Sequence, residues 1–402
     1  MPTTSRSRSP RPGAADNSAV PGAPPPAAAR RQAHSASVSP PPVLVRQVRG
    51  RIVESEHRGR VVEAEADGRI IRALGDPGHV VALRSCAKPF ALVALLDAGG
   101  AAAFDLAPAE IAIMAGSHSG EDLHVRTLQG VFRRAGVTQA NLACGAEGMP
   151  LDPLTAARLS RDGERPSPIR HTCSGQHAAS ILLSRLRSWP LDTYWQADHP
   201  AQVEVRLALA RCFGTLPDRL PAATDDCGLP TFAVELRELA RAYAFLADPA
   251  ALPASDPRAM VAPSLQVVRD AMLEFPEMVA GTRDRLDTSL MKGLPGALLS
   301  KGGQEGLRAI AILPNALAKI GDRGSGKRRA TGLVIKIEDG SGHERAGWAA
   351  AVEALTQAGV LDGQPLRVLG RYQRPAVLDP QGRIVAEAIA EFTLAPVGEL
   401  SG

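Results

Sequence analysis

The sequence predicts an α/β fold in which strands from both ends of the chain form one sheet and the residues between them form a helical part. Apolar, strand-like runs occur at 43–45 and 59–64, and they return at 307–313 and 332–338. The residues from 108 to 290 have a mostly helical pattern. Strand patterns at the two ends of a chain with helices between them favour a single sheet with a helical insertion.

The elements follow in order along the chain. Residues 43–85 have the pattern of antiparallel strands, with a short third run at 70–71. A helix is predicted from 88 to 97, because Gly99 and Gly100 stop it. The remaining expected elements are helices over 123–134 and 347–357 and a last strand near 387–392.

Residues 1–42 are rich in proline, serine, alanine and arginine, which predicts a disordered tail before a catalytic domain at 43–402. No apolar core of a secretory signal and no run of 18 apolar residues is present, so we expect a cytoplasmic protein without a membrane span. The 5 cysteines are odd in number and irregularly spaced, which argues against a disulfide framework.

Charge and aromatic content exclude some classes of partner. The formal net charge is +4, and the arginines of the tail account for it, so the domain is about neutral. Aromatic residues make up only 3% of the chain. We therefore expect neither a nucleic-acid surface nor attraction to an anionic membrane.

A possible nucleophile lies in Arg84-Ser85-Cys86-Ala87-Lys88-Pro89. Positions i and i+3 are neighbours on a helix, so Ser85 and Lys88 can face the same side. Serine with a lysine base is a known arrangement for covalent catalysis, provided that burial or a second cation lowers the lysine pKa. An N-cap serine followed by a solvated lysine would give the same four-residue pattern.

Four further segments contain reactive residues at the junctions of predicted elements. They are Ala115–Glu121 (AGSHSGE), His171–Ser180 (HTCSGQHAAS), Asp225–Thr231 (DDCGLPT) and Ser300–Gly306 (SKGGQEG), the last with Lys301 in a predicted glycine-rich turn.

Together, in this order, the five segments resemble the rhizobial-type L-asparaginases of the asparaginase II family, from about Val43 to about Ala395. The resemblance implies a serine β-lactamase/glutaminase-like fold, with an antiparallel sheet and a helical part. It also implies hydrolysis of the side-chain amide of L-asparagine to L-aspartate and ammonia, and a homodimer.

By motif position, the resemblance implies that Ser85 pairs with Lys88 and that Ser117 pairs with Lys301. It implies substrate contacts from Arg84, His118 and Asp225. In this interpretation Ser85 attacks the amide carbon, Lys88 takes its proton, and Ser117 with Lys301 relays protons. Ser117 as the nucleophile is the alternative.

The family also binds zinc through two cysteines and a lysine, and the matching cysteines are Cys173 and Cys227. The family lysine is replaced by Gln176 in this chain. A glutamine amide is a weaker zinc donor than sulfur or a ring nitrogen, so zinc is possible but its occupancy is doubtful. His171 or His177 could substitute.

Three other functions are compatible with parts of the pattern. A penicillin-recognising serine hydrolase shares S-x-x-K, with Lys301-Gly302-Gly303 as the counterpart of K-T-G, but no S-D-N lies between them. Another amidohydrolase, such as a glutaminase, would use the same residues. A non-catalytic zinc-binding or interaction protein would use the cysteines but would not need the serines and lysines.

Overall fold

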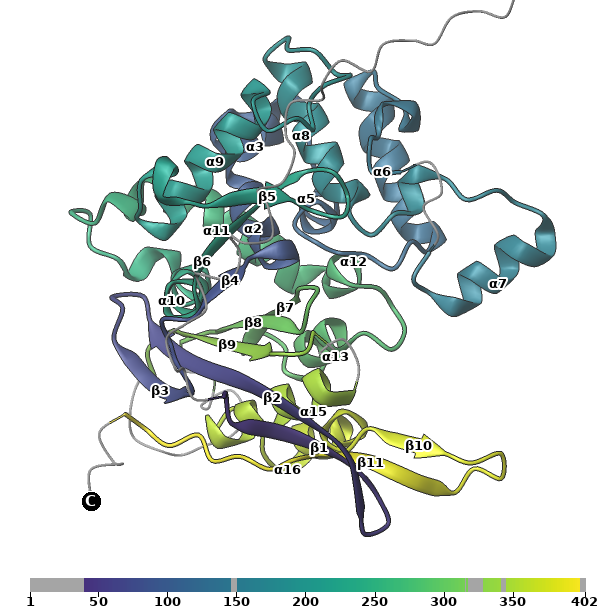
Figure 1. Cartoon of the computed structure of the whole chain (residues 1–402). Helices are drawn as coiled ribbons and strands as arrows, with labels where there is room; N and C mark the ends of the chain where they lie inside the picture. The colour runs from purple at the N-terminus through teal and green to yellow at the C-terminus, as the bar shows by residue number, and fades with distance from the viewer. Residues whose placement is uncertain (1–39, 146–149, 315, 317–327, 341–344, 398–402) are drawn as a thin grey trace, which may run out of the picture. The chain divides into compact units, whose positions relative to one another are not determined.

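An antiparallel sheet of eight strands joins the two ends of the described chain (Figure 1). The computed structural model describes residues 40–145, 150–314, 316, 328–340 and 345–397. The predicted tail at 1–42 therefore lies outside the described residues, apart from its last three positions. Residues from Pro41 onward form one compact unit.

Strands and helices were assigned over the described residues. The strands are β1 (Val43–Arg49), β2 (Ile52–Glu65), β3 (Ile70–Leu74), β4 (Val80–Ala82), β5 (Ala222–Thr224), β6 (Pro230–Glu235), β7 (Leu298–Gly302), β8 (Leu307–Ile312), β9 (Thr331–Ile337), β10 (Ala376–Leu378) and β11 (Ile384–Ala390). The helices are η2 (Arg84–Ala87, a 3-10 turn), α2 (Lys88–Ala91), α3 (Val93–Asp97), α4 (Gly100–Ala103), α5 (Pro108–Met114), α6 (Asp122–Ala135), α7 (Pro153–Asp162), α8 (Ser174–Leu186), α9 (Pro200–Phe213), α10 (Leu236–Ala247), α11 (Ala262–Glu274), α12 (Pro276–Val279), α13 (Leu286–Gly293), α15 (Arg345–Gln357), α16 (Gly363–Val368) and α17 (Gly370–Gln373).

The strand order of the large sheet is β10-β11-β1-β2-β9-β8-β7, with β3 also paired to β2. Every pairing is antiparallel. The N-terminal strands thus pair with strands from the last part of the chain, and β4, β6 and β5 form a separate small sheet. This confirms the predicted antiparallel sheet with a helical part.

The central strands are apolar along most of their length. All six residues of β8 are buried, and six of the seven residues of β9 are buried. A strand that is covered on both faces has such a continuous apolar pattern. Helix α10 supplies part of that cover, because it packs on β9, β2 and β8.

The region 108–290 is mostly helical, and it also contains the short strands β5 and β6, which flank a turn and pair with each other. Two expectations about local structure need correction. The helix expected at 88–97 is divided at Leu92 into α2 and α3. The last strand begins at Ile384 and not near 387. Residues 387–390 of β11 pair with β1, and the earlier residues from Ile384 pair with β10.

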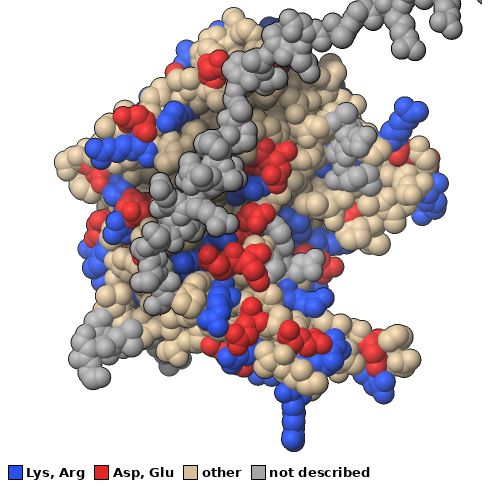
Figure 2. All heavy atoms as spheres, viewed as in Figure 1, with Lys and Arg blue, Asp and Glu red and all other residues tan. Residues whose placement is uncertain are grey.

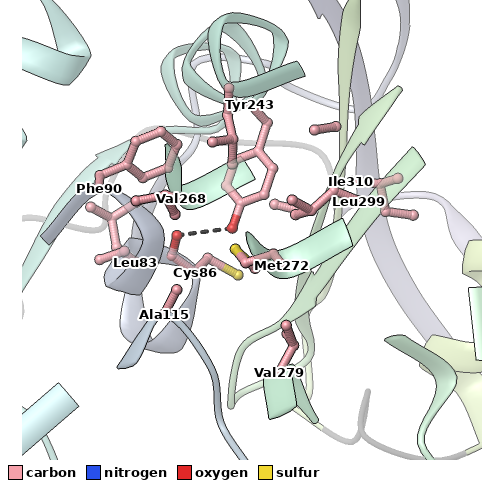
Figure 3. Packing of buried hydrophobic residues seen from close by; sticks show 14 of the residues in the cluster. Leu83, Cys86, Phe90, Ala115, Tyr243, Val268, Met272, Val279, Leu299 and Ile310 are labelled. Atoms are coloured by element: carbon pink, nitrogen blue, oxygen red, sulfur yellow. Dashed lines mark hydrogen bonds between the residues drawn. The ribbon is translucent and has the colours of Figure 1, made fainter. Parts of the chain in front are cut away.

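Tyr243 of α10 connects the sheet core to the segment that carries Ser85 (Figure 3). Its ring is fully buried and makes an edge contact with Phe90, with 5.4 Å between centroids. Its hydroxyl donates to the backbone carbonyl of Cys86 at 2.9 Å. A buried carbonyl needs a donor, so Tyr243 fixes the backbone of η2 from within the core.

Charged side chains of both signs are mixed on the face of the molecule in Figure 2. Buried carboxylates are paired with arginines, as at Glu63, which accepts from Arg72 and Arg328. No helix in the described part of the chain is long and apolar enough to span a membrane.

Gly332 of β9 lies where α10 approaches the sheet most closely. A Cβ at this position would sit 1.9 Å from the backbone oxygen of Ala240. We predict that Gly332→Ala lowers the free energy of unfolding by about 2–3 kcal/mol, because strand and helix must separate. Gly370→Ala is the matched control, since a Cβ there meets nothing within 4 Å. Urea unfolding of both variants measures the effect, and equal midpoints would contradict the close packing.

Candidate active site

The segment that carries Ser85 and Lys88 turns sharply from β4 into two short helices. Arg84 has φ 46°, in the left-handed region that side chains other than glycine rarely adopt. Its backbone N–H donates to Thr231 Oγ1 at 3.2 Å, and the N–H of Leu83 donates to the carbonyl of Phe232 at 2.7 Å. These bonds to β6 hold the strained turn and place Ser85 at the start of η2.

Ser117 lies beyond the end of α5, on a loop held by two backbone contacts. Its N–H donates to the carbonyl of Val279 at 2.7 Å. Its carbonyl accepts from the guanidinium of Arg285 at 3.3 Å. Its side chain is half-buried, and it points toward the amines of two lysines.

Lys88 and Lys301 meet at the hydroxyl of Ser117. The Nζ of Lys88 lies 3.0 Å from Ser117 Oγ, and the Nζ of Lys301 lies 2.9 Å from the same atom. Both lysines are buried, with 2% and 1% of their surface exposed. Ser85 Oγ makes no hydrogen bond with any residue that the structure describes. The structure therefore brings both lysines to Ser117, and the pairing of Ser85 with Lys88 stays a prediction.

Lys301 lies on β7, and not in the glycine-rich turn where we expected it, because the turn begins only at Gly303. Burial and then the nearby charge of Lys88 lower the pKa of Lys301 to about 7. Asp287 opposes this shift, since its negative charge favours the protonated amine. A lysine with a pKa near neutrality can exchange protons with a hydroxyl at physiological pH.

Arg84 and Asp225 lie together beside this cluster. Arg84 Nε donates to Asp225 Oδ2 at 3.1 Å, and its Nη2 donates to Asp226 Oδ2 at 2.6 Å. Both Arg84 and Asp225 line a small pocket that also includes Gln176 and Cys227. Substrate contacts by Arg84 and Asp225 stay a prediction.

His118 is fully buried beneath the loop that carries Ser117. Its Nε2 shares a hydrogen bond with Ser174 Oγ at 2.8 Å, and its Nδ1 accepts from the N–H of Gly120 at 3.1 Å. Burial lowers the pKa of His118 well below its usual value, so the ring is neutral. These hydrogen bonds link the loop to Ser174 at the start of α8. A direct substrate contact by His118 stays a prediction.

Cys173 and Cys227 come together although 54 positions separate them in the sequence numbering. The interaction between the two thiols lowers the pKa of Cys173 and raises the pKa of Cys227. Lys88 Nζ also donates to Cys173 Sγ, at 3.3 Å. The cysteine pair therefore contacts the lysine–serine cluster directly.

Zinc binding at this cysteine pair stays a prediction. Among the described residues, no three histidine, cysteine or carboxylate side chains are arranged to hold a metal ion. His177 is fully buried and its Nδ1 is bound to Tyr194 Oη at 2.6 Å, while His171 Nδ1 accepts from the backbone of Cys173 at 3.1 Å. Zinc in proteins needs at least three protein ligands, and Cys173 and Cys227 supply two.

Three residues that hold this site were absent from the sequence-based prediction. Arg285 supports Ser117, Tyr243 supports η2, and Asp287 accepts hydrogen bonds from both neighbours of Lys301. Each looks like an ordinary helix residue in the sequence, and only the tertiary fold brings it to the site.

Comparisons with known proteins identify the family to which the chain belongs. The profile of the L-asparaginase II family matches residues 45–390. A glutaminase from Bacillus is similar in structure, with a TM-score of 0.38 and 12% identity over 75% of this chain and 91% of that chain. A β-lactamase from Mycobacterium bovis has a TM-score of 0.36 and 15% identity over 75% of this chain and 95% of that chain. A comparison with curated proteins finds no significant match.

The family match spans the strands at both ends of the domain and all five sequence segments that carry the cluster. It alone carries the assignment of activity, since the similar structures are too distant to do so. The chain therefore belongs to the L-asparaginase II family and is an L-asparagine amidohydrolase.

Proposed function

We propose that this protein hydrolyses L-asparagine through a proton-transfer unit made of Ser85, Lys88, Ser117 and Lys301. The observation that carries the proposal is the position of Ser117 Oγ, which lies within 3.0 Å of the amines of both lysines. A hydroxyl between two amines can accept a proton from one and release its own proton to the other. Ser117 is thus suited to connect the lysine beside Ser85 with the lysine on β7.

In this mechanism Lys88 first passes a proton to Ser117 Oγ while the proton of Ser117 moves to neutral Lys301, which leaves Lys88 neutral. Ser85 Oγ then attacks the side-chain amide carbon as Lys88 accepts the hydroxyl proton. The unit returns a proton to the amide nitrogen, so that ammonia leaves and an ester on Ser85 remains. Water then attacks the ester, and aspartate leaves as the hydroxyl of Ser85 is restored.

Ser117 as the nucleophile is the second candidate, and one observation favours it. Ser117 Oγ is bonded to Lys301, the lysine whose pKa is lowered to about 7. Against this, Ser85 is the serine whose hydroxyl is not occupied by another described residue, which leaves it available to substrate. Arg84, which precedes Ser85, and Asp225 line the adjoining pocket and supply charges for the α-carboxylate and α-amine of asparagine.

Cytoplasmic location and a homodimer belong to the same proposal. All five cysteines are free thiols and buried, which suits a reducing compartment. The homodimer rests on the family resemblance. Zinc binding is proposed as weak, because Gln176 stands where the family has a lysine and the described residues supply two thiol donors.

We expect the purified protein to release ammonia from L-asparagine much faster than from L-glutamine, and to leave a chromogenic β-lactam intact. Ammonia release with each amide and absorbance with the β-lactam measure these rates. Equal rates on the two amides would indicate a general amidohydrolase, and β-lactam turnover without asparaginase activity would indicate the penicillin-recognising alternative.

We predict that Ser85→Ala and Lys88→Ala each lower kcat by about 10²–10⁴-fold, because each removes a member of the proton-transfer unit. The double variant should be little worse than either single variant. Lys292→Ala is the matched control, since the only ion pair of this exposed lysine with a described residue is the one with Glu277, and exposed ion pairs contribute little.

Steady-state kinetics measure these effects, with circular dichroism as the folding control. Mass spectrometry of a trapped ester then identifies the acylated serine. Near-normal kcat in both single variants would show that the S-x-x-K pair is structural, and an ester on Ser117 would exchange the roles of the two serines.

We predict that Gln176→Lys tightens zinc binding, because it restores the amine donor of the family. Gln381→Lys, at an exposed position, is the matched control for the added charge. Metal content after dialysis against a chelator measures the effect. Stoichiometric zinc that survives this treatment in the unmodified protein would show that another residue completes the site.

A further inference from the structure

A buried carboxylate holds both chain neighbours of Lys301. Asp287, in the first turn of α13, is 6% exposed. Its Oδ1 accepts from the hydroxyl of Ser300 at 2.6 Å, and its Oδ2 accepts from the N–H of Gly302 at 2.9 Å. Arg308 of β8 also donates to Asp287. The strand is therefore fixed to one side chain immediately before and immediately after Lys301.

Successive side chains of a strand point to opposite faces, so the contact between Ser300 and Asp287 fixes which face Lys301 points to. Ser300 faces Asp287, so Lys301 points to the opposite face of β7. On that face its Nζ reaches Ser117 Oγ at 2.9 Å and the carbonyl of Gly302 at 2.7 Å. A shift or rotation of β7 would move this amine away from Ser117.

The segment before α13 also holds the other partner of this contact. The guanidinium of Arg285 donates to the carbonyl of Ser117 at 3.3 Å. Arg285 and Asp287 are two positions apart, so one short segment holds the backbone of Ser117 and the backbone around Lys301. Both ends of the Ser117–Lys301 contact thus depend on the same piece of chain.

Charge acts at the same place. The titratable and charged groups that act on the amine of Lys301 are Lys88 from α2, Cys86 from η2, and Arg285 and Asp287 from the α13 segment, with Arg308 of β8 as the ion-pair partner of Asp287. Burial, Lys88 and Arg285 lower the pKa of Lys301, whereas Asp287 raises it. Burial also raises the pKa of Cys86 to about 11, so its thiol stays neutral where Lys301 titrates. Arg308 and Lys301 in turn hold the pKa of Asp287 down, at about 2, so its carboxylate stays ionised.

We propose that Asp287 is a positioning residue for the reaction: it fixes β7 so that the amine of Lys301 meets Ser117, and its negative charge offsets the flanking cations Lys88 and Arg285. The simpler alternative is that Asp287 and Arg308 form a buried ion pair that serves stability alone. The positioning role predicts that a neutral residue at 287 shifts the pH dependence of the rate, whereas a purely structural ion pair predicts no shift.

The test compares Asp287→Asn with Glu63→Gln and rests on the proposed role of Lys301. Glu63 is a matched control, because it is fully buried and accepts from Arg328 and the hydroxyl of Thr331. Two strands, β9 and β8, separate its strand from β7. Melting temperature, kcat, KM and the pH profile of kcat/KM for asparagine are measured for each protein.

The unmodified enzyme should lose activity below about pH 7, because Lys301 must be neutral to accept a proton. Removing the charge of Asp287 lowers the pKa of Lys301 further, so the acid limb of the profile should move down by about one pH unit. The kcat of Asp287→Asn should fall by about 10–100-fold with little change in KM. Glu63→Gln should lower the melting temperature and leave the limb in place.

An unmoved limb in a folded Asp287→Asn variant would overturn the proposal and leave a structural ion pair. If that variant does not fold, Ser300→Ala decides, because it removes one hydrogen bond to Asp287 and keeps the charge. It should lower kcat several-fold with the acid limb unmoved, and an unchanged kcat would overturn the positioning role. A flat acid limb in the unmodified enzyme would instead contradict the proposed role of Lys301.

Discussion

The site depends on one arrangement, in which the buried amines of Lys88 and Lys301 both contact the hydroxyl of Ser117. Removing a lysine from water disfavours its charged form, and a second cation close by adds to that effect. The pKa of Lys301 is lowered as a result. Each amine also has a hydrogen-bond acceptor: Cys173 Sγ accepts from Lys88, and the carbonyl of Gly302 accepts from Lys301. Hydrogen bonds to their backbone groups hold both the strained turn at Arg84 and the loop at Ser117.

The cysteine pair adds a polar contact to this cluster. The two thiols interact with each other, and Cys173 also contacts Lys88. Cys173 accepts a hydrogen bond from the amine of Lys88. This bond restricts the orientation of the amine that the proposed mechanism uses.

Much of the architecture could be predicted from the sequence, because apolar runs at the two ends of the domain are strong strand signals. The short strands β5 and β6 could not, since three exposed residues of β5 and a proline at the start of β6 have no strand pattern. Lys301 looked like a turn residue because glycines follow it, yet the contacts of Asp287 extend β7 through Gly302. The residues of the cluster could be named from motif order, but the convergence of both lysines on Ser117 is a tertiary result that local pattern does not contain.

The strand order also has a consequence for how the chain becomes a folded protein. Strands β1 and β2 near the N-terminus complete their pairing only with β9 and β11, which lie beyond Thr331. During synthesis these two strands leave the ribosome early, and their free edges stay unpaired until β9 and β11 have been synthesised. Contacts of such long sequence separation slow folding and leave apolar edges open to other chains. Removing the C-terminal strands would therefore leave β1 and β2 unpaired along one edge. A ribosome-associated chaperone would protect this domain most before β9 and β11 are synthesised.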